Sequence, residues 1–326
     1  MSFSILSPEE YGLYEAFVKQ HPHGNFMQSL AWTRVKKNWQ FEAAVSRDEA
    51  GALRGAMLVL ILPDAKGDGK ALLYAPRGPV CDYADRAAVA DLAAAARELA
   101  ARYPAGVFKA DPYILASEQS LIDVFTGAGL SFQPGLGFHD CVQPRHNYML
   151  THLAGKTYDD LLQQFGRKTR YYVKMPTERG VTVSYSGAEK LDEFYKLYSE
   201  TGERQAFSIR PRQYLEDFLN AYGENIRLYL AYYEGQPLAG AITVNYAGKA
   251  AYVYGCSTSE HRELCPTYAL QWAMIRWALD TGCDIYDMQG ICIDPAESEQ
   301  LYSVYQFKKK FNGEALEFAG DFYFDF

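Results

Sequence analysis

The sequence predicts an α/β protein built from two domains in tandem. Residues 227–291 show the pattern of three strands, a helix and a further strand, an order in which the helix packs on the sheet. Residues 1–140 and the remainder of the chain share a similar order of elements without obvious sequence identity, which indicates a duplicated α/β domain. A length of 326 residues also exceeds what one hydrophobic core comfortably supports, so about two domains are expected.

The segment 227–291 has the clearest pattern in the chain. Apolar, β-rich runs predict strands at residues 228–233, 239–246, 250–255 and 285–291. The turn 234–237 closes a hairpin, and a helix begins at Pro266 and ends at Gly282. This order matches the C-terminal half of a GNAT-type acyltransferase core, but other α/β folds have the same periodicity.

The first half of the chain alternates helical and β-rich patterns. Ser7 and Pro8 form a capped helix start, and residues 21–24 break that helix. Helices are expected at residues 7–20, 29–37, 86–102 and 120–128. Strands are expected at residues 41–46, 53–62, 71–75 and 107–110, separated by acidic and Gly-bearing turns.

From Asn147 the pattern of elements starts again. The region around Pro144 and Arg145 is interpreted as the crossover between the two domains. Strands are expected at residues 148–152 and 181–185. Helices are expected at residues 157–165, 167–175, 189–201 and 211–221.

Composition excludes several classes of protein. A net charge of -8 argues against a surface built entirely for nucleic acid, although a local basic patch is compatible with it. Six cysteines without a C-x-x-C pair predict reduced thiols and no zinc site, and no metal or cofactor is expected. Residues 1–11 lack a signal-peptide pattern, and no run approaches the roughly 20 apolar residues of a membrane span, so a cytoplasmic location is expected.

Three residues of the first half are candidates for a site. Lys36 lies between aromatic residues at the end of an amphipathic helix, where a lysine complementing the helix dipole is the alternative. Arg77 lies in a rigid turn, either in a site or in a solvated loop. Asp111 follows a strand, the usual place for a site carboxylate in an α/β sheet, although a turn-capping role fits equally.

The second half contains three further candidate segments. A basic stretch interleaved with tyrosines fits phosphate or RNA contact, or alternatively a solvated helix face; its cations are Arg167, Lys168, Arg170 and Lys174. Arg210 and Tyr214 are four residues apart at an expected helix start, so they would share a face that can grip a phosphate. Phe307 and Lys308 place a ring and a cation near the end of the last helix, with the same dipole alternative as Lys36.

Taken together, these segments resemble the Fem peptidyltransferases, which add amino acids to peptidoglycan stem peptides. In the first half, the resemblance rests on residues 28–39, 77–80 and 110–112. In the second half, it rests on residues 143–145, 210–214, 252–255, 277–281 and 285–287. The order of these motifs is kept over nearly the whole chain, so the resemblance is more specific than any one motif.

The resemblance implies two GNAT-like domains. The first would comprise residues 1–145 plus a C-terminal tail of about residues 316–326, and the second residues 146–315. No long charged heptad segment is present, so the coiled-coil arm of the FemA and FemB branch is not expected, which favours the FemX-like branch.

The resemblance also implies roles for individual residues. Lys36 and Arg210 would hold the diphosphate of a UDP-sugar, with the substrate-binding residues Tyr214, Tyr254 and Arg77. Asp111 would position or deprotonate the attacking amine, and Phe307 and Lys308 would lie beside the reacting ester, where Lys308 stabilises the oxyanion. Gly106 departs from the family pattern, because a groove tyrosine is expected at its position.

The function expected from this resemblance is transfer of an amino acid from aminoacyl-tRNA to UDP-MurNAc-pentapeptide or lipid II. The tRNA would contact the basic stretch, and a monomer with peripheral membrane contact is expected. The first alternative is an acyl-CoA-dependent N-acetyltransferase, which needs a Gly-rich pyrophosphate loop at a helix start. Residues 261–266, which lead into the core helix, contain no glycine, and this counts against CoA. The second is a non-catalytic binder of wall precursors, in which Asp111 and Lys308 would have no role.

Overall fold

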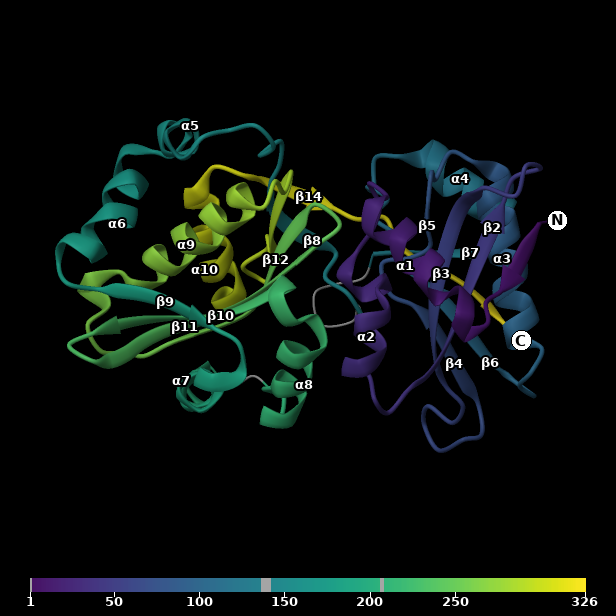
Figure 1. Ribbon diagram of the computed structural model, residues 1–326, viewed down its shortest axis with the longest axis horizontal. Helices are drawn as coiled ribbons and strands as arrows, with labels where there is room; N and C mark the ends of the chain where they lie inside the picture. The colour runs from purple at the N-terminus through teal and green to yellow at the C-terminus, as the bar shows by residue number, and fades with distance from the viewer. Residues whose placement is uncertain (1, 136–141, 206–207) are drawn as a thin grey trace. The chain divides into compact units, whose positions relative to one another are not determined.

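A computed structural model describes residues 2–135, 142–205 and 208–326, and the chain divides into two compact units (Figure 1). The first comprises Met1–Arg145 with Glu317–Phe326, and the second comprises His146–Leu316. Each unit has one mixed sheet with helices packed against it, which confirms the predicted α/β class. No helix within the described residues is both long and apolar enough to cross a membrane.

The sheet of the first unit has the strand order β1-β2-β3-β4-β6-β15-β7, and β5 pairs with β3. Its strands are β1 (Phe3–Ile5), β2 (Gln40–Arg47), β3 (Leu53–Leu62), β4 (Ala71–Ala75), β5 (Val80–Cys81), β6 (Gly106–Ala110), β7 (Ser131–Pro134) and β15 (Gly320–Asp325). The pairing of β4 with β6 is parallel, because helix α3 carries the chain between them. The other pairings described in this sheet are antiparallel.

The helices of this unit are α1 (Tyr11–Gln20), α2 (Leu30–Val35), α3 (Arg86–Ala100) and α4 (Gln119–Gly127). Asp85 caps α3 by accepting hydrogen bonds from the Ala87 and Ala88 amides, each at 3.0 Å. Alternate residues of β3, including Met57 and Val59, join the buried cluster with α3 and α4. This cluster is the core of the first unit on the α3 and α4 side of the sheet.

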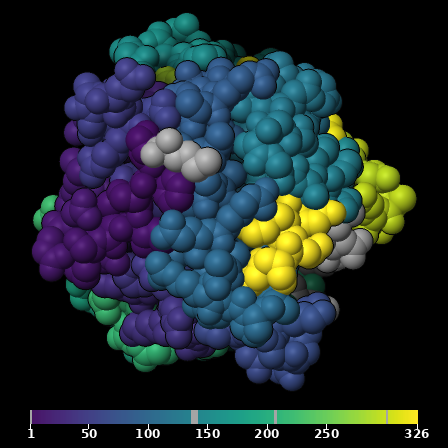
Figure 2. Space-filling model, turned by 90° about the vertical axis from the view of Figure 1, so that its right-hand side faces the viewer, coloured from purple at the N-terminus to yellow at the C-terminus, as the bar shows by residue number. Residues whose placement is uncertain are grey.

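The C-terminal strand β15 lies between β6 and β7, pairing antiparallel with both. Figure 2 shows the C-terminal residues, in yellow, set into the surface of the first unit beside residues drawn in blue. Gly106 and Phe326 exchange main-chain hydrogen bonds of 2.8 and 3.0 Å. A Cβ atom at Gly106 would lie 2.2 Å from the Ala71 oxygen and 2.7 Å from the Phe326 ring. Glycine is therefore required where the family resemblance led us to expect a tyrosine.

The sheet of the second unit has the strand order β14-β8-β13-β12-β11-β10-β9. Its strands are β8 (His146–Leu150), β9 (Thr182–Ser186), β10 (Ile226–Tyr233), β11 (Gln236–Tyr246), β12 (Lys249–Ser257), β13 (Ile285–Gly290) and β14 (Glu314–Glu317). The expected hairpin joins β10 and β11, with Glu234 and Gly235 at positive φ. The parallel pair here is β12 with β13, joined through α9, as β4 and β6 are joined through α3. This repeated βαβ unit agrees with the predicted duplication.

The helices of the second unit are α5 (Tyr158–Gln164), α6 (Arg167–Glu178), α7 (Leu191–Gln205), α8 (Arg212–Tyr222), α9 (Pro266–Asp280) and α10 (Glu299–Lys308). Figure 1 shows α6, α9 and α10 on one side of the sheet and α7 and α8 on the other. Met274 and Trp277 of α9 are buried against the sheet together with Tyr286 of β13. The predicted helix at 167–175 is longer than expected, because it continues through Pro176.

The short strands β1, β5, β7 and β14 were not predicted, since two to four residues carry too little periodicity. Strand β8 begins two residues before the predicted start of 148–152. The cysteines of the described part, at positions 81, 256, 265, 283 and 292, are free. Cys141 lies outside the described residues.

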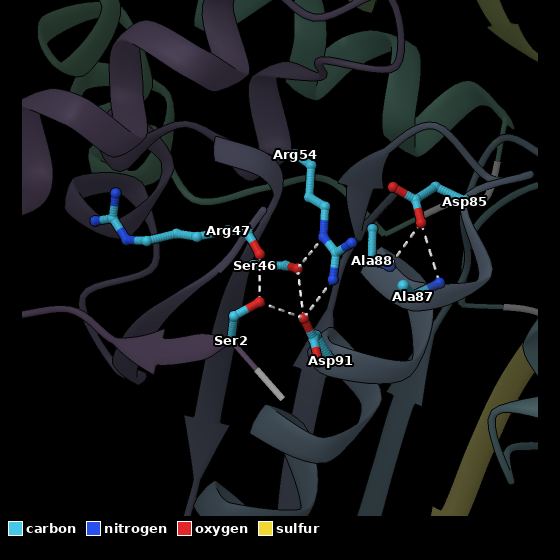
Figure 3. Close-up of polar contacts among 8 residues, drawn as sticks. All are labelled: Ser2, Ser46, Arg47, Arg54, Asp85, Ala87, Ala88 and Asp91. Atoms are coloured by element: carbon cyan, nitrogen blue, oxygen red, sulfur yellow. Dashed lines mark hydrogen bonds and ion pairs between the residues drawn. The ribbon is translucent and has the colours of Figure 1, made fainter. Parts of the chain in front are cut away.

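A polar network joins the N-terminal strands of the first unit to α3 (Figure 3). Arg54 of β3 and Asp91 of α3 form an ion pair with an Nη2–Oδ2 distance of 2.8 Å. The hydroxyl of Ser46 donates to the same carboxylate oxygen at 2.8 Å and that of Ser2 at 3.3 Å. Asp91 is only 5% exposed and Ser46 is fully buried, so Asp91 satisfies a hydroxyl group that water cannot reach.

Replacing Asp91 with alanine should lower the free energy of unfolding of the first unit by about 2–3 kcal/mol, because it leaves the Ser46 hydroxyl and the Arg54 guanidinium without their carboxylate. Urea unfolding monitored by circular dichroism measures this change. The control is Asp123→Ala on the exposed face of α4, which should change stability by less than about 0.5 kcal/mol. Equal unfolding midpoints for the two variants would contradict the role given to Asp91.

Candidate active site

Lys308 is a buried cation at the last residue of α10. Its side chain is 5% exposed. Its Nζ donates to the carbonyl oxygens of Gln289 at 3.2 Å and Gly290 at 2.8 Å. Among the described residues, these two oxygens are its protein acceptors. An ammonium group has three N–H donors, so one donor is left for a reacting group.

The end of β13 holds these two carbonyls in position. Gln289 has a left-handed backbone with φ of 63°, and its carbonyl and that of Gly290 both face the Lys308 ammonium. The carboxylate of Asp287 accepts from the Gln289 amide N–H at 2.6 Å and from its side-chain amide at 2.8 Å. Asn147 of β8 donates to both oxygens of Asp287 at 3.1 and 3.2 Å. Asp287 and Asn147 are 3% and 0% exposed, so they form a rigid support beneath the Lys308 contacts.

Two opposing effects set the charge of Lys308. Burial lowers its pKa to about 8, and the negative charge of Asp287 opposes this shift. The ammonium form therefore predominates at pH 7 and is lost as the pH rises through about 8. Lys308 can supply a positive charge near neutral pH, which an oxyanion stabiliser requires.

Phe307 belongs to an aromatic cluster beside Lys308. Its ring meets Tyr268 of α9 edge-on, with centroids 5.1 Å apart, and Phe311 at 5.5 Å. Lys309 and Lys310, the next residues, are exposed. Three consecutive lysines thus occupy different environments, and Lys308 is the buried one.

Asp111 is the first residue after β6 and is 3% exposed. One carboxylate oxygen accepts from the Tyr74 hydroxyl at 2.9 Å, and the other from the Arg77 amide N–H at 2.6 Å. Burial raises the pKa of Asp111 to about 6, against the lowering effects of the Arg77 charge and of both hydrogen bonds. Asp111 is thus mostly ionised at pH 7 and becomes neutral below about pH 6. It lines a cavity of about 20 Å³, room for roughly one water molecule.

Arg77 is buried. The alternative interpretation expected its side chain in a solvated loop, which the structure does not show. Its guanidinium carbon lies 4.9 Å from the Tyr113 ring centroid and 4.7 Å from that of Phe318. Its Nη2 donates to the Pro144 oxygen at 3.3 Å. With 3% exposure, Arg77 acts on Asp111 through its backbone N–H and its charge.

Lys36 is the C-terminal cap of α2 and is half-buried. Its Nζ lies 4.9 Å from the ring centroid of Trp32 on the preceding turn. This cation–π contact orients the side chain along the helix end. Both predicted features of Lys36, a helix end and an aromatic neighbour, are present.

Arg210 precedes α8 and does not lie on it, because the helix begins at Arg212 with Pro211 as its cap. The expectation that Arg210 and Tyr214 share a helix face was therefore wrong. The two side chains nevertheless meet, with the guanidinium carbon 5.2 Å from the Tyr214 ring centroid. Tyr254 of β12 hydrogen-bonds with both of them. The resulting cluster combines an exposed guanidinium with two phenol groups, a set of donors that suits a phosphate oxygen.

The basic stretch forms the first two turns of α6. Arg167, Lys168 and Lys174 are exposed, and Arg170 donates to the Gln163 oxygen at 3.2 Å. The buried face of the same helix carries Val173. The cations therefore lie on the solvent side, as both the RNA-contact and the solvated-face interpretations require.

Several residues of these clusters were not found from the sequence. Asp287 and Asn147 support Lys308, and Tyr74 holds Asp111. A carboxylate inside the apolar run 285–291 was a usable signal, since a buried Asp needs partners. Asn147 and Tyr74 carry no comparable local signal, because their roles depend on strand pairing.

Replacing Asp287 with asparagine should lower the pKa of Lys308 further below about 8, because it removes the negative charge that opposes burial. The pKa can be read by NMR from ¹³C-methylated lysines, with Lys308 assigned through Lys308→Met. Asp284→Asn is the control, because Asp284 is exposed and acts on Lys249. A Lys308 pKa that is equal or higher in Asp287→Asn would disprove this electrostatic support.

Comparison with known proteins shows which family the chain is related to. The FemAB family model matches residues 6–236 and 232–326. The UDP-N-acetylmuramoylpentapeptide-lysine N(6)-alanyltransferase of Weissella viridescens is 33% identical to this chain, over 98% of this chain and 94% of the relative. The lipid II:glycine glycyltransferase of Staphylococcus aureus is 27% identical, over 95% of this chain and 90% of the relative.

Solved structures show the same relationship. The crystal structure of FemX superposes with a TM-score of 0.89 and 25% identity, covering 99% of this chain and 97% of that one. A tandem GNAT protein from the clavulanic acid pathway, at 12% identity and a TM-score of 0.57, shares the fold and covers 99% of this chain and 98% of its own. By family model, sequence identity and coverage, the chain belongs to the FemAB family.

Proposed function

We propose that this protein is an aminoacyltransferase that moves an amino acid from aminoacyl-tRNA to the stem-peptide amine of a peptidoglycan precursor. The product would be the first unit of an interpeptide bridge. Membership of the FemAB family supports the transferase class. The names of two relatives place their reactions on a MurNAc-pentapeptide lysine and on lipid II, which supports a precursor of this kind as acceptor.

The observation that carries the proposal is the environment of Lys308. A buried ammonium held by two carbonyls has a fixed direction and one donor to spare. In a water-poor site, such a donor stabilises a developing oxyanion more than it stabilises a neutral ester. A simple cation at a helix end would not need burial or a supporting carboxylate.

The reaction assigned to this site is aminolysis of an ester. The amine nitrogen attacks the ester carbonyl carbon, and a C–N bond forms while the carbonyl oxygen gains negative charge. Collapse of this intermediate breaks the C–O bond to the tRNA ribose. The proton lost by the amine passes to the ribose oxygen that leaves.

We assign Asp111 to the amine. Its carboxylate is ionised at pH 7, and each oxygen accepts one described hydrogen bond, from Tyr74 and from Arg77. A carboxylate has about four acceptor positions, so it can also accept from an ammonium or amine. Its pKa of about 6 suits a group that orients the amine or takes its proton near neutral pH.

Binding of the precursor is assigned to the residues whose side chains can donate hydrogen bonds to a diphosphate. Lys36 and Arg210 would each contact diphosphate, and Tyr214 and Tyr254 would contribute hydroxyl groups. Arg77, assigned to the substrate from sequence, is proposed to act indirectly by positioning Asp111. Three exposed cations of α6, Arg167, Lys168 and Lys174, and the half-buried Arg170 are assigned to tRNA. Such a donor would place the reaction in the cytoplasm.

One assay separates this proposal from its alternatives. Radiolabelled amino acid on charged tRNA is incubated with the protein and either UDP-MurNAc-pentapeptide or lipid II, and acetyl-CoA is offered in parallel. Label in the precursor supports the proposal, whereas acetyl transfer alone supports the GNAT alternative. Precursor binding without transfer of either group would identify a binder. The segment before α9 counts against CoA, because His261 and Cys265, not glycines, hold its positive-φ positions.

Lys36→Met and Arg210→Met should each raise the acceptor KM by roughly 10- to 150-fold, the scale of one charge-assisted hydrogen bond of about 1.5–3 kcal/mol. Steady-state kinetics with varied UDP-MurNAc-pentapeptide measures this change. Lys37→Met is the matched control, since Lys37 is the exposed neighbour of Lys36. If KM is unchanged in both variants, the diphosphate assignment is wrong.

Lys308→Met should lower kcat by roughly two to three orders of magnitude with little change in acceptor KM, since one oxyanion donor is lost after binding. Single-turnover transfer from charged tRNA measures the effect. Lys309→Met and Lys310→Met are the controls, because both side chains are exposed, and their effects should be mild. Similar activities for all three variants would show that the run is only a cationic helix end.

A further inference from the structure

A second concave site lies in the second unit, and it uses none of the catalytic or diphosphate-binding residues assigned above. It has a volume of about 510 Å³, within the roughly 300–1,000 Å³ typical of ligand pockets. Its walls come from α6 and α9, and its floor from β9 and β10. We call it the aromatic groove, defined by Thr177, Tyr185, Arg227, Trp272, Arg276 and Trp277.

Three of these side chains form a continuous stack. The guanidinium carbon of Arg227 lies 4.6 Å from the Trp277 ring centroid and 3.8 Å from that of Tyr185. Trp277 is 4% exposed, whereas Tyr185 is 59% exposed. The stack therefore starts in the core and ends in an open aromatic ring. A planar ligand can extend it by stacking on Tyr185.

Two further cations lie on the helices that wall this groove. Arg276 is exposed on α9, and its guanidinium carbon lies 4.5 Å from the Tyr158 ring centroid. Lys174 is exposed on α6 three residues before Thr177, so both lie on one side of that helix. The one acidic lining residue, Asp280, accepts a hydrogen bond from the Tyr158 hydroxyl. The described residues at the edge of the aromatic groove are thus suited to an anionic ligand with a flat ring.

We infer that the aromatic groove binds an unpaired nucleotide of the donor RNA, with its base on Tyr185 and its phosphates near Arg276 and Lys174. This inference rests on the proposed function, which makes an RNA the donor. Base stacking on an aromatic ring combined with cations along the backbone is how proteins hold single-stranded RNA. A lipid surface fits less well, because it would need apolar side chains that project outward, whereas this platform lies in a groove.

The test measures binding of the full chain to a fluorescein-labelled single-stranded oligoribonucleotide and to uncharged tRNA. Tyr185→Ala should weaken binding about tenfold or more, the scale of one lost base stack. Tyr185→Phe keeps the ring and should bind like the unaltered protein. Leu13→Ala is the control, since it removes an exposed apolar side chain, 47% exposed, from the first unit.

Salt dependence separates stacking from charge. Tyr185→Ala should keep the slope of log K against log salt, whereas Lys174→Gln should flatten it by about 0.7, the value for one phosphate contact on a single strand. Unchanged RNA affinity in Tyr185→Ala, or no oligonucleotide binding by the unaltered protein, overturns the inference. So does a Tyr185-dependent affinity for phosphatidylglycerol vesicles without an effect on RNA. Because uncharged RNA is used, Tyr185-dependent binding without any amino-acid transfer would disprove the proposed function alone.

Discussion

The main-chain hydrogen bonds of β15 are the interaction on which the first unit depends. This strand supplies the second neighbour of β6 and the described neighbour of β7. It also brings Phe322 and Phe324 into the core. Without it, one edge of β6 would leave backbone groups unpaired beside a buried cluster, which is costly. The last residues of the chain therefore complete a sheet that its first residues begin.

This long-range pairing explains how much of the fold the sequence could predict. Long elements with strong periodicity, such as β3, α3 and α9, were predicted within a few residues, because each carries its own pattern of buried positions. Strand β7 has four mostly exposed residues, and it is a strand because β15 lies beside it. Gly106 shows the same limit, since the ring of Phe326 determines which residue fits there. Neither strand β7 nor the need for glycine at position 106 can be predicted from the neighbouring residues in the sequence.

The candidate site likewise has features that the sequence could predict and features that it could not. Lys308, Asp111 and Arg210 could be selected from the sequence because residue type and family resemblance mark them. Their environments could not be predicted, since Lys308 takes its acceptors from the end of β13, and Asp287 is held by Asn147 of another strand. The wrong helix face for Arg210 has a local cause, because Pro211 caps a helix that starts one residue later. Residue type and position along the chain therefore selected the candidate residues, and strand pairing determined their surroundings.

Arg77 in the first unit and Lys308 in the second are both buried cations. They differ in how firmly they hold their charge, and this difference indicates which of them suits a role in the proposed transfer reaction. Arg77 is 3% exposed between two aromatic rings, and its guanidinium stays charged at any accessible pH. It is therefore suited to holding Asp111 ionised. Lys308 is 5% exposed, and its pKa of about 8 lies close to neutrality. The ammonium form of such a lysine is only slightly more stable than its neutral form at pH 7. A nearby oxyanion stabilises the ammonium form strongly, because the new negative charge offsets the cost of its burial. In the proposed reaction, burial would therefore prepare Lys308 for the transition state of acyl transfer more than for its ground state.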